Sequence, residues 1–202
     1  MAANSTADAS PPLTVSRFTL RVLAWLPVAF VAWYFAAPLL LAPAVLLMRG
    51  VAHAGFAGLV RSIEQAGTVA TFVTPLRPGG AALASVLTVD VNLLLYSFGL
   101  PLFAALTLAA RARAYGRYLA LGYAALVPCI AWGALADFLK SVAVTGGPAI
   151  ASQTGFVAWQ RETIVFAYQF GALILPAVAP AVLWVAMHGK FIAALRRPRQ
   201  PA

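Results

Sequence analysis

Charged side chains are scarce in this sequence. Of its 202 residues, 9% are charged and 62% are hydrophobic, whereas soluble domains carry roughly 25% charged residues. A soluble chain of this length has too much surface for its volume to bury so many apolar side chains. The mean hydropathy of +0.88 agrees with this deficit. The composition therefore excludes an ordinary soluble domain and predicts that lipid surrounds much of the chain.

Residues that carry enzyme chemistry are also few. The chain has one cysteine, two histidines and five acids. The single Cys129 excludes an intrachain disulfide, and its apolar surroundings in LVPCIAW are typical of a small buried hydrophobe. Neither His53 nor His188 is placed to activate it. Metal-ligand spacing, a Gly-x-Ser-x-Gly elbow and a phosphate-binding loop are all missing from the sequence. We expect no catalytic residue, no metal and no cofactor.

The excess of basic residues does not indicate that the protein binds nucleic acid. The net charge is +9 and the isoelectric point is about 10.6. The basic residues are spread around apolar runs, with no basic stripe and no recognition motif. They report membrane topology instead, and we predict no nucleic-acid partner.

Long apolar runs are what the sequence has in abundance. A membrane helix needs about 20 apolar residues, and four runs qualify, at about 22–48, 93–110, 118–136 and 163–187. The first is too long for a secretory signal, so we interpret it as an uncleaved anchor, and its prolines predict a kink. We predict an all-α membrane protein with four transmembrane helices in residues 17–192. A disordered segment, 1–16, precedes this domain and a basic tail, 193–202, follows it.

Lys and Arg positions predict the orientation. With the N-terminus in the cytoplasm, nine basic residues lie inside and five lie outside. The short RARAYGR connection is the clearest inside marker. Both termini are therefore predicted to be cytoplasmic in a protein that crosses the membrane several times.

Residues 49–92 form the one sizeable segment outside the membrane. In RGVAHAGFAGLVRSIEQAG the apolar residues recur with helical spacing, Arg61 and Glu64 can pair, and Gly67 can end the helix. TVATFVTPL and ASVLTVDVN, joined through RPGG, predict a β-hairpin. A lone hairpin is marginal in water, so it needs the helix or a strand from another chain. We expect a small extracytoplasmic helix plus β-hairpin.

Two aspartates lie at the predicted outer ends of helices. Asp90 and Asp137 would suit an aspartyl-type intramembrane peptidase, in which one carboxylate is charged and the other protonated. The simpler interpretation is that Lys140 neutralises Asp137 and that Asp90 caps the second helix together with Asn92. A small transporter is a third alternative, although ionisable residues at mid-membrane depth are missing. Gly99, Gly122, Gly133 and Gly171 permit close contact between helices.

Several stretches together resemble one family. These are LPVAFVAWYFAAP, VRSIEQAGTVATFVT, VNLLLYSFGLPLFAALTLAARAR, PCIAWGALADFLKSVAV, SQTGFVAWQRETIVFAYQFG and PAVAPAVLWVAMHGKF. In order and spacing they resemble the exosortase H-associated membrane proteins, small integral membrane proteins of bacteria, over about Leu26–Phe191. Leu93 departs from the Pro that follows Val-Asn in that family. The resemblance is carried by Tyr, Pro, Gly and Trp placements on membrane helices, which are not chemically specific.

The resemblance implies a context in protein sorting. Exosortases are membrane transpeptidases with a Cys, an Arg and a His at the outer side, and this chain resembles the companion. The resemblance implies association with an exosortase and no further molecular role. We predict a non-catalytic accessory subunit in the bacterial inner membrane, with lipid and an exosortase as partners. Our candidates for the partner interface are Asp90, Asn92, Tyr96, Pro101, Asp137, Lys140, Trp159 and Gln169.

Overall fold

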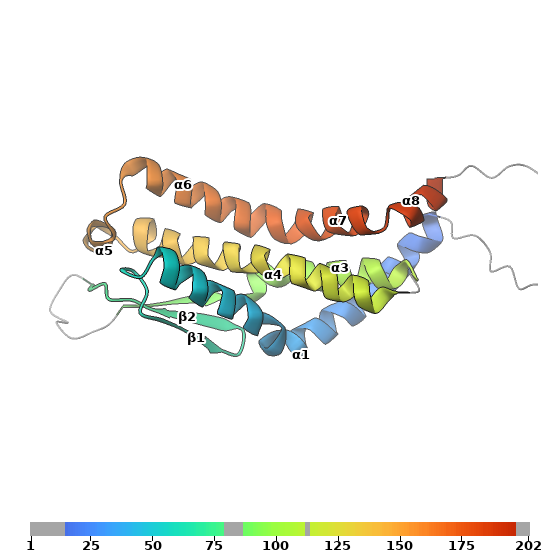
Figure 1. The fold of residues 1–202 in the computed structure, drawn as a ribbon, viewed down its shortest axis with the longest axis horizontal. Helices are drawn as coiled ribbons and strands as arrows, with labels where there is room; N and C mark the ends of the chain where they lie inside the picture. The colour runs from blue at the N-terminus through green and yellow to red at the C-terminus, as the bar shows by residue number, and fades with distance from the viewer. Residues whose placement is uncertain (1–14, 79–86, 112–113, 197–202) are drawn as a thin grey trace, which may run out of the picture.

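The protein is an elongated helical bundle with a small sheet at one end (Figure 1). The structure is a computed structural model that describes residues 15–78, 87–111 and 114–196. Both ends of the described chain lie at the same end of the long axis, which we call the terminal end. The sheet and the short helix α5 (Pro148–Ala151) lie toward the other, which we call the sheet end.

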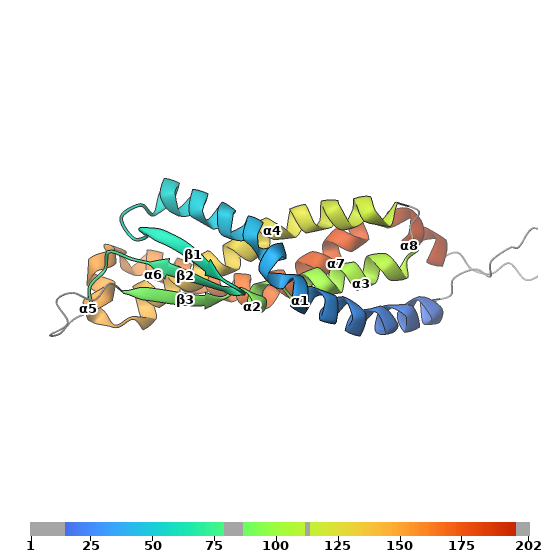
Figure 2. The same ribbon diagram turned by 90° about the horizontal axis from the view of Figure 1, so that it is seen from below.

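Helix α1 (Val15–Gly55) runs along the whole molecule and bends in its middle (Figure 2). Its 41 residues correspond to about 60 Å of helix, roughly twice the hydrocarbon core of a bilayer. Pro43 cannot donate a hydrogen bond to Leu39, which accounts for the bend predicted from the prolines. Two side chains bond the carbonyl oxygens beside this gap: Gln65 Nε2 lies 2.7 Å from Pro38 O, and Tyr123 Oη lies 2.7 Å from Leu40 O.

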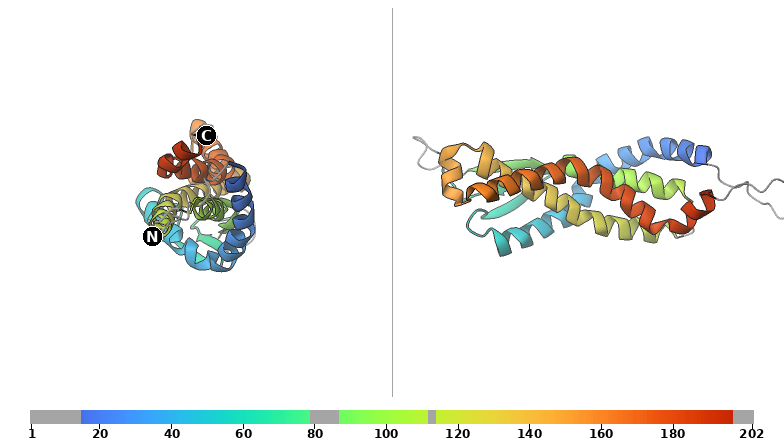
Figure 3. Two further views of the ribbon diagram at one scale, coloured as in Figure 1. Left: turned by 90° about the vertical axis from the view of Figure 1, so that its right-hand side faces the viewer. Right: turned by 90° about the horizontal axis from the view of Figure 1, so that it is seen from above.

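Two further helical segments are long and apolar enough to cross a membrane. Helix α4 (Tyr115–Lys140) continues through a π-helical turn, η1 (Ser141–Thr145). Helix α6 (Ala158–Gln169) continues through a second π-helical turn, η3 (Phe170–Ile174), into α7 (Leu175–Met187). With α1, the described residues contain three such candidate spans. Figure 3 shows α6 and α7 running along the molecule as one continuous rod.

The predicted span at 93–110 is a shorter helical segment. It consists of α2 (Leu94–Ser97) and α3 (Gly99–Ala109), which meet at Phe98. Helix α3 packs against α1, α4 and α7 and completes the bundle at the terminal end (Figure 2). Its apolar length is below that of the three long spans.

The sheet has three antiparallel strands in the order β1–β2–β3. These are β1 (Ser62–Ala66), β2 (Val69–Val73) and β3 (Thr88–Asn92). Alternate residues are buried because one face of the sheet packs on α4. At the centre of that contact Phe72 of β2 stacks on Phe138 of α4, with ring centroids 4.4 Å apart.

The surface helix predicted after Arg49 is wrong. Residues up to Gly55 prolong α1, and residues 62–66 form β1. In SIEQA only Ile63 is fully buried, an alternation that fits a strand packed on one side. Gly67, expected to end a helix, has φ +62° and forms the first position of a two-residue hairpin turn. The predicted pair of Arg61 and Glu64 does not form, and among the described residues Lys140–Asp137 is the one ion pair.

The predicted pairing of the two Thr- and Val-rich stretches is confirmed. β2 and β3 are antiparallel neighbours, with Thr71 opposite Asp90. The turn itself, including Gly79 and Gly80 of RPGG, lies outside the described residues. Residues 1–14 and 197–202 of the predicted terminal segments also lie outside them, whereas α1 includes Val15 and Ser16 and α8 (Gly189–Arg196) takes up the start of the predicted tail.

Glycines set the closest helix crossings, as the sequence predicted. A Cβ added at Gly171 would lie 2.8 Å from the Cα of Gly133, and one at Gly99 would lie 2.6 Å from the carbonyl oxygen of Pro176. A Cβ at Gly122 would overlap the ring of Phe103. Small residues at these points allow the helices to approach without help from the hydrophobic effect, which does not drive association within lipid.

Candidate functional site

Four polar side chains meet where α2, α4 and α6 approach one another. They are Tyr96, Asp137, Lys140 and Tyr168, which we call the junction cluster. Lys140 Nζ lies 2.9 Å from Asp137 Oδ1 and 3.6 Å from the centre of the Tyr168 ring. Tyr96 is 3% exposed, and its ring packs on Gly133, one turn before Asp137 on α4. The cluster therefore joins three elements that are distant in sequence.

Sequence spacing on α4 explains how the cluster is built. Gly133 and Asp137 are four residues apart, so they lie on one face of the helix, one turn apart. A Cβ at Gly133 would overlap the Tyr96 ring. The missing side chain lets that ring pack directly on α4, one turn from Asp137. Lys140 follows three residues later and neutralises the carboxylate, which confirms the predicted pair.

The chemistry of the junction cluster is that of an anchor. The only carboxylate is engaged by the Lys140 ammonium, and that ammonium also lies over the Tyr168 ring. No histidine or cysteine belongs to the cluster, and no group of three metal-ligating residues occurs among the residues that the structure describes. The arrangement holds the elements together and offers no activated nucleophile.

Asp90 does not cap the second helix, contrary to the sequence-based interpretation. Its Oδ1 accepts a hydrogen bond of 2.7 Å from the Thr71 hydroxyl on the open face of the sheet. Asn92 does act as predicted, because its Oδ1 accepts the backbone N–H of Leu94 at 3.1 Å. Asp137 belongs to α4, against the opposite, buried face of the sheet. The two aspartates therefore have separate partners and do not form a proton-sharing pair.

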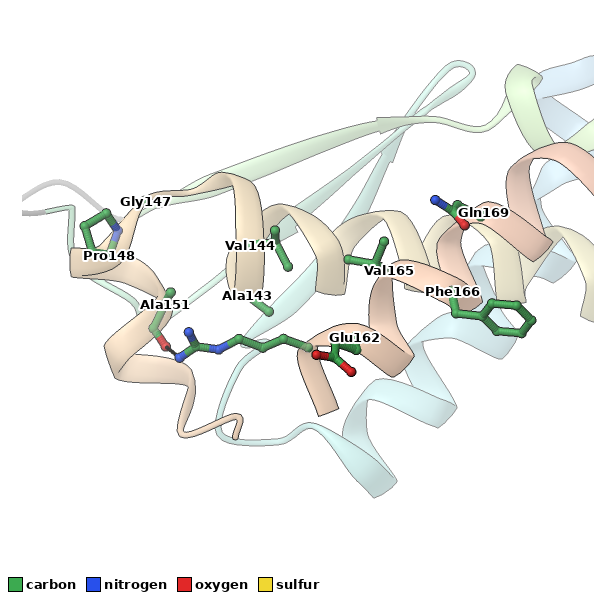
Figure 4. Close-up of a pocket in the computed structure, with 10 residues that line it drawn as sticks. Ala143, Val144, Gly147, Pro148, Ala151, Glu162, Val165, Phe166 and Gln169 are labelled. Atoms are coloured by element: carbon green, nitrogen blue, oxygen red, sulfur yellow. Dashed lines mark hydrogen bonds between the residues drawn. The ribbon is translucent and has the colours of Figure 1, made fainter. Parts of the chain in front are cut away.

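A groove opens between η1, α5 and α6 (Figure 4). Its volume is about 550 Å³, and its walls are mostly small apolar side chains. Glu162 and the predicted candidate Gln169 supply polar groups along α6. Arg161 fixes the shape of the groove, because its guanidinium donates to the carbonyls of Ala151 and Phe156 at 3.4 and 3.1 Å. Trp159 does not line the groove and is 65% exposed.

A second groove lies between α1, α3 and α4, toward the terminal end. It measures about 430 Å³, and the predicted candidate Pro101 lines it together with Trp33 and Tyr123. Almost all of its other lining residues are aliphatic or aromatic. Pro101 therefore shapes an apolar surface away from the junction cluster. The predicted interface residues do not form one continuous site, because Pro101 lines this groove and Gln169 lines the other.

Thr71 and Arg49 are the contact-forming residues that sequence reasoning missed. Thr71 positions Asp90, and Arg49 Nε donates to the carbonyl of Ile63 at 2.8 Å. The alternating pattern in SIEQA and TVATFVT was the available signal, because a β1–β2 hairpin at Gly67 puts Glu64 opposite Thr71. Because SIEQA was interpreted as part of a helix, the pairing of Glu64 with Thr71 was not predicted.

The remaining reactive side chains lie apart from the cluster. Cys129 is partly buried within α4, and its Sγ lies 3.8 Å from Ala125 O of the preceding turn. His53 lies in the last turn of α1. His188 follows α7 at the terminal end, where it stacks on Trp184 and burial lowers the pKa of its imidazole. Histidine and cysteine are therefore not combined in a catalytic pair here.

Comparison with known proteins gives one match. The family model described as exosortase H-associated membrane protein matches residues 12–191, which is most of the chain. No curated protein and no solved structure matches it. The match agrees with the bundle of long apolar helices and with the resemblance carried by the individual stretches. The chain belongs to the family of exosortase H-associated membrane proteins.

Proposed function

We propose that the protein is a non-catalytic accessory subunit of an exosortase H sorting system. The observation that carries the proposal is the family match over residues 12–191, whose description names association with exosortase H. On this proposal the chain binds the exosortase within the bacterial inner membrane and helps it to act on its substrates. The junction cluster and the sheet supply fixed surfaces for that contact.

The arrangement of acids favours an accessory role over an aspartyl peptidase. A catalytic pair of aspartates must share one site, so that one carboxyl group stays protonated beside the other. Here Asp90 is bonded to Thr71 and Asp137 to Lys140, on different elements. A transporter would need a polar path between the helices, whereas the groove beside α1, α3 and α4 has an almost wholly apolar lining.

The proposed topology places the sheet end outside the cytoplasm. Helix α1 is about twice as long as a bilayer core requires, so part of it projects together with the sheet. The open face of the sheet carries Ser62, Glu64, Thr88 and Asp90, which suit water. With α2 and α3 as the fourth crossing, both termini remain in the cytoplasm, in agreement with the distribution of Lys and Arg.

Co-purification in mild detergent tests the association. The tagged full chain is expressed with exosortase H, with and without a sorting substrate, and the eluted proteins are quantified. We expect elution at a fixed ratio. A parallel preparation with an unrelated tagged multi-pass protein controls for mixed micelles. Absence of the exosortase from the elution, under both conditions, contradicts the proposal.

Two further measurements test the absence of catalysis and the topology. The purified chain alone should not cleave a sorting substrate, and Asp90→Asn with Asp137→Asn should leave sorting unchanged wherever folding and partner binding are intact. For the topology, single cysteines are placed by Ser62→Cys or Gly116→Cys in a Cys129→Ala background. We expect an impermeant maleimide to label only the Ser62→Cys protein in intact spheroplasts. Labelling of the Gly116→Cys protein instead contradicts the orientation.

A further inference from the structure

The two edges of the sheet differ in whether another described element covers them. In β3 the backbone groups of Val89 and Val91 pair with β2, a register fixed by the bonds Leu93 N to Thr68 O and Thr74 N to Leu87 O. The N–H and C=O groups of the alternate residues Thr88, Asp90 and Asn92 therefore point away from the sheet. No backbone partner for them occurs within the described part of the chain.

The edge at β1 is covered by α1. Arg49 donates to the outward carbonyl of Ile63 at 2.8 Å, and the Gln65 side chain bonds Pro38 O of the same helix. Figure 2 shows β1 next to the sheet-end half of α1 and β3 on the far side of the sheet. Natural proteins usually block exposed edges, since an open edge pairs with other strands. The described structure blocks one edge of this sheet and leaves the other accessible.

Charge on the sheet indicates which strand would fit. Glu64, Thr71 and Asp90 lie side by side across the open face, in one row of directly paired residues. The two acids are exposed, and neither forms an ion pair with another described residue. A strand added next to β3 would continue this row with the residue opposite Asp90. A Lys or Arg at that position makes a favourable cross-strand pair, and an acid makes an unfavourable one.

The same row argues against a second copy of this chain as the occupant. A two-fold antiparallel pairing of β3 with β3 over its five residues places Asp90 opposite Asp90, because Asp90 is the central residue. Like charges that face each other directly across strands are destabilising. A basic segment of a different polypeptide meets no such conflict.

We propose that β3 binds an extended segment of the partner polypeptide by strand addition, with a Lys or Arg of that segment opposite Asp90. Up to three outward N–H groups and three outward C=O groups, from Thr88, Asp90 and Asn92, make the backbone bonds. The side chain of Asp90, on the strand that makes these bonds, selects for positive charge. The inference rests on the proposed association with exosortase H and specifies the surface that makes it.

Hydrogen exchange measured by mass spectrometry tests the proposal directly. The full chain in detergent is compared alone and in the co-purified exosortase complex, with peptides that cover residues 87–94. We expect the outward amides to exchange on the order of tenfold more slowly in the complex. Peptides from β1, whose edge α1 already covers, should not change and serve as the internal control.

Variants at Asp90 separate backbone pairing from charge. Asp90→Pro removes an outward N–H and the side-chain bond from Thr71, but it leaves the backbone bonds to β2 intact, since proline is tolerated on the open side of an edge strand. It should weaken the complex about tenfold. Asp90→Lys keeps the backbone and reverses the charge, and about fivefold weakening is expected. Glu64→Lys, on the strand whose edge α1 covers, is the matched charge-reversal control and should bind as the wild type does. Asp90→Asn retains an acceptor for Thr71 without the charge.

The outcomes separate the two proposals. If the wild-type chain forms no complex, the accessory function itself fails. If the complex forms but exchange at 87–94 is unchanged and Asp90→Pro and Asp90→Lys bind as wild type does, strand addition is wrong and the accessory function stands. Slower exchange that accompanies a dimer mass of the chain alone, or that appears in lipid nanodiscs without a partner, also overturns the assignment to a partner segment.

Discussion

The two ends of this molecule are held together by different means. At the sheet end, side-chain hydrogen bonds link distant segments, for example Thr71 to Asp90 and Gln153 to the backbone of Arg77. Toward the terminal end, contacts depend on fit: Gly99 under Pro176, Gly122 under Phe103, and Phe18 stacked on Trp184 with centroids 5.4 Å apart. Buried polar atoms without a partner, among them Trp184 Nε1 and Thr107 Oγ1, lie in the helical part.

The difference follows from the solvent that each end is expected to meet. Within lipid, apolar burial does not distinguish a helix contact from a lipid contact, so close packing at small residues decides the arrangement. In water, a small sheet is stable only when its apolar face is covered, and that requires α4 beneath it. Each of the following experiments tests this contrast.

The largest effect is expected where the sheet is attached to the bundle. Phe72 is fully buried and stacks on Phe138, so Phe72→Ala should lower the free energy of unfolding by about 3–5 kcal/mol. Limited proteolysis should then cleave the sheet before the helices. Val73→Ala, whose side chain points to the other face, should cost about 1 kcal/mol at most. Equal losses from the two variants would show that the sheet does not depend on α4.

The next effect tests the close packing of the long helices at small residues. Gly171→Val would push a side chain into Gly133, and we expect a loss of about 1–3 kcal/mol with α6 displaced from α4. Thermal unfolding in detergent measures it. Gly50→Val in α1 is the control, because a Cβ at Gly50 has no neighbour within 4 Å, and its effect should stay within about 0.5 kcal/mol. A neutral Gly171→Val would contradict the close crossing.

A smaller effect compares the two hydrogen bonds beside the bend in α1, one donated from the sheet and one from α4. Tyr123→Phe removes the donor to Leu40 O and should cost about 1 kcal/mol, because lipid offers no replacement. Gln65→Leu removes the donor to Pro38 O beside the sheet, and the effect should be smaller because Gln65 is half-exposed and water can replace it. Melting temperatures of both variants in nanodiscs give the ranking. A larger loss for Gln65→Leu than for Tyr123→Phe would contradict the expectation that water reaches Gln65 and not Tyr123.

The smallest effect is a pH dependence at the terminal end. His188 is buried and its Nδ1 lies 3.1 Å from Trp184 O, and burial lowers its pKa below the usual value of about 6.5. The unfolded chain therefore binds a proton more readily than the folded one, and stability should fall as the pH drops below about 6.5. Melting curves at several pH values measure this. His188→Phe keeps an aromatic ring and should flatten the dependence, and an unchanged slope would assign it to another group.

The helical part was largely predictable, and the sheet was predictable only in part. Apolar runs, prolines and glycines depend on local spacing, so the long helices, the bend in α1 and the glycines that permit close contact followed from the sequence. Which glycines meet, such as Gly133 and Gly171, is shown by the structure alone. Strand β1 did not, because SIEQA is short and its apolar residues also fit a helical period. Its true partner, β2, lies across a single turn at Gly67.

The junction cluster was foreseen only at its local pair. Lys140 and Asp137 are three residues apart on one helix, so spacing alone predicts their contact. Tyr96 and Tyr168 come from other helices, and only the packing of α2 and α6 on α4 shows that they converge there. The bond from Thr71 to Asp90 depends on the register between β2 and β3, and the long connection between these two strands does not fix that register in the sequence.

The bend in α1 has a mechanical consequence. Its two flanking carbonyls are tied to opposite parts of the molecule, Pro38 to the sheet through Gln65 and Leu40 to α4 through Tyr123. A change in the tilt of the first helix must therefore shift the sheet or break one of these ties. The bend is therefore the point at which α1 is fastened both to the sheet and to α4.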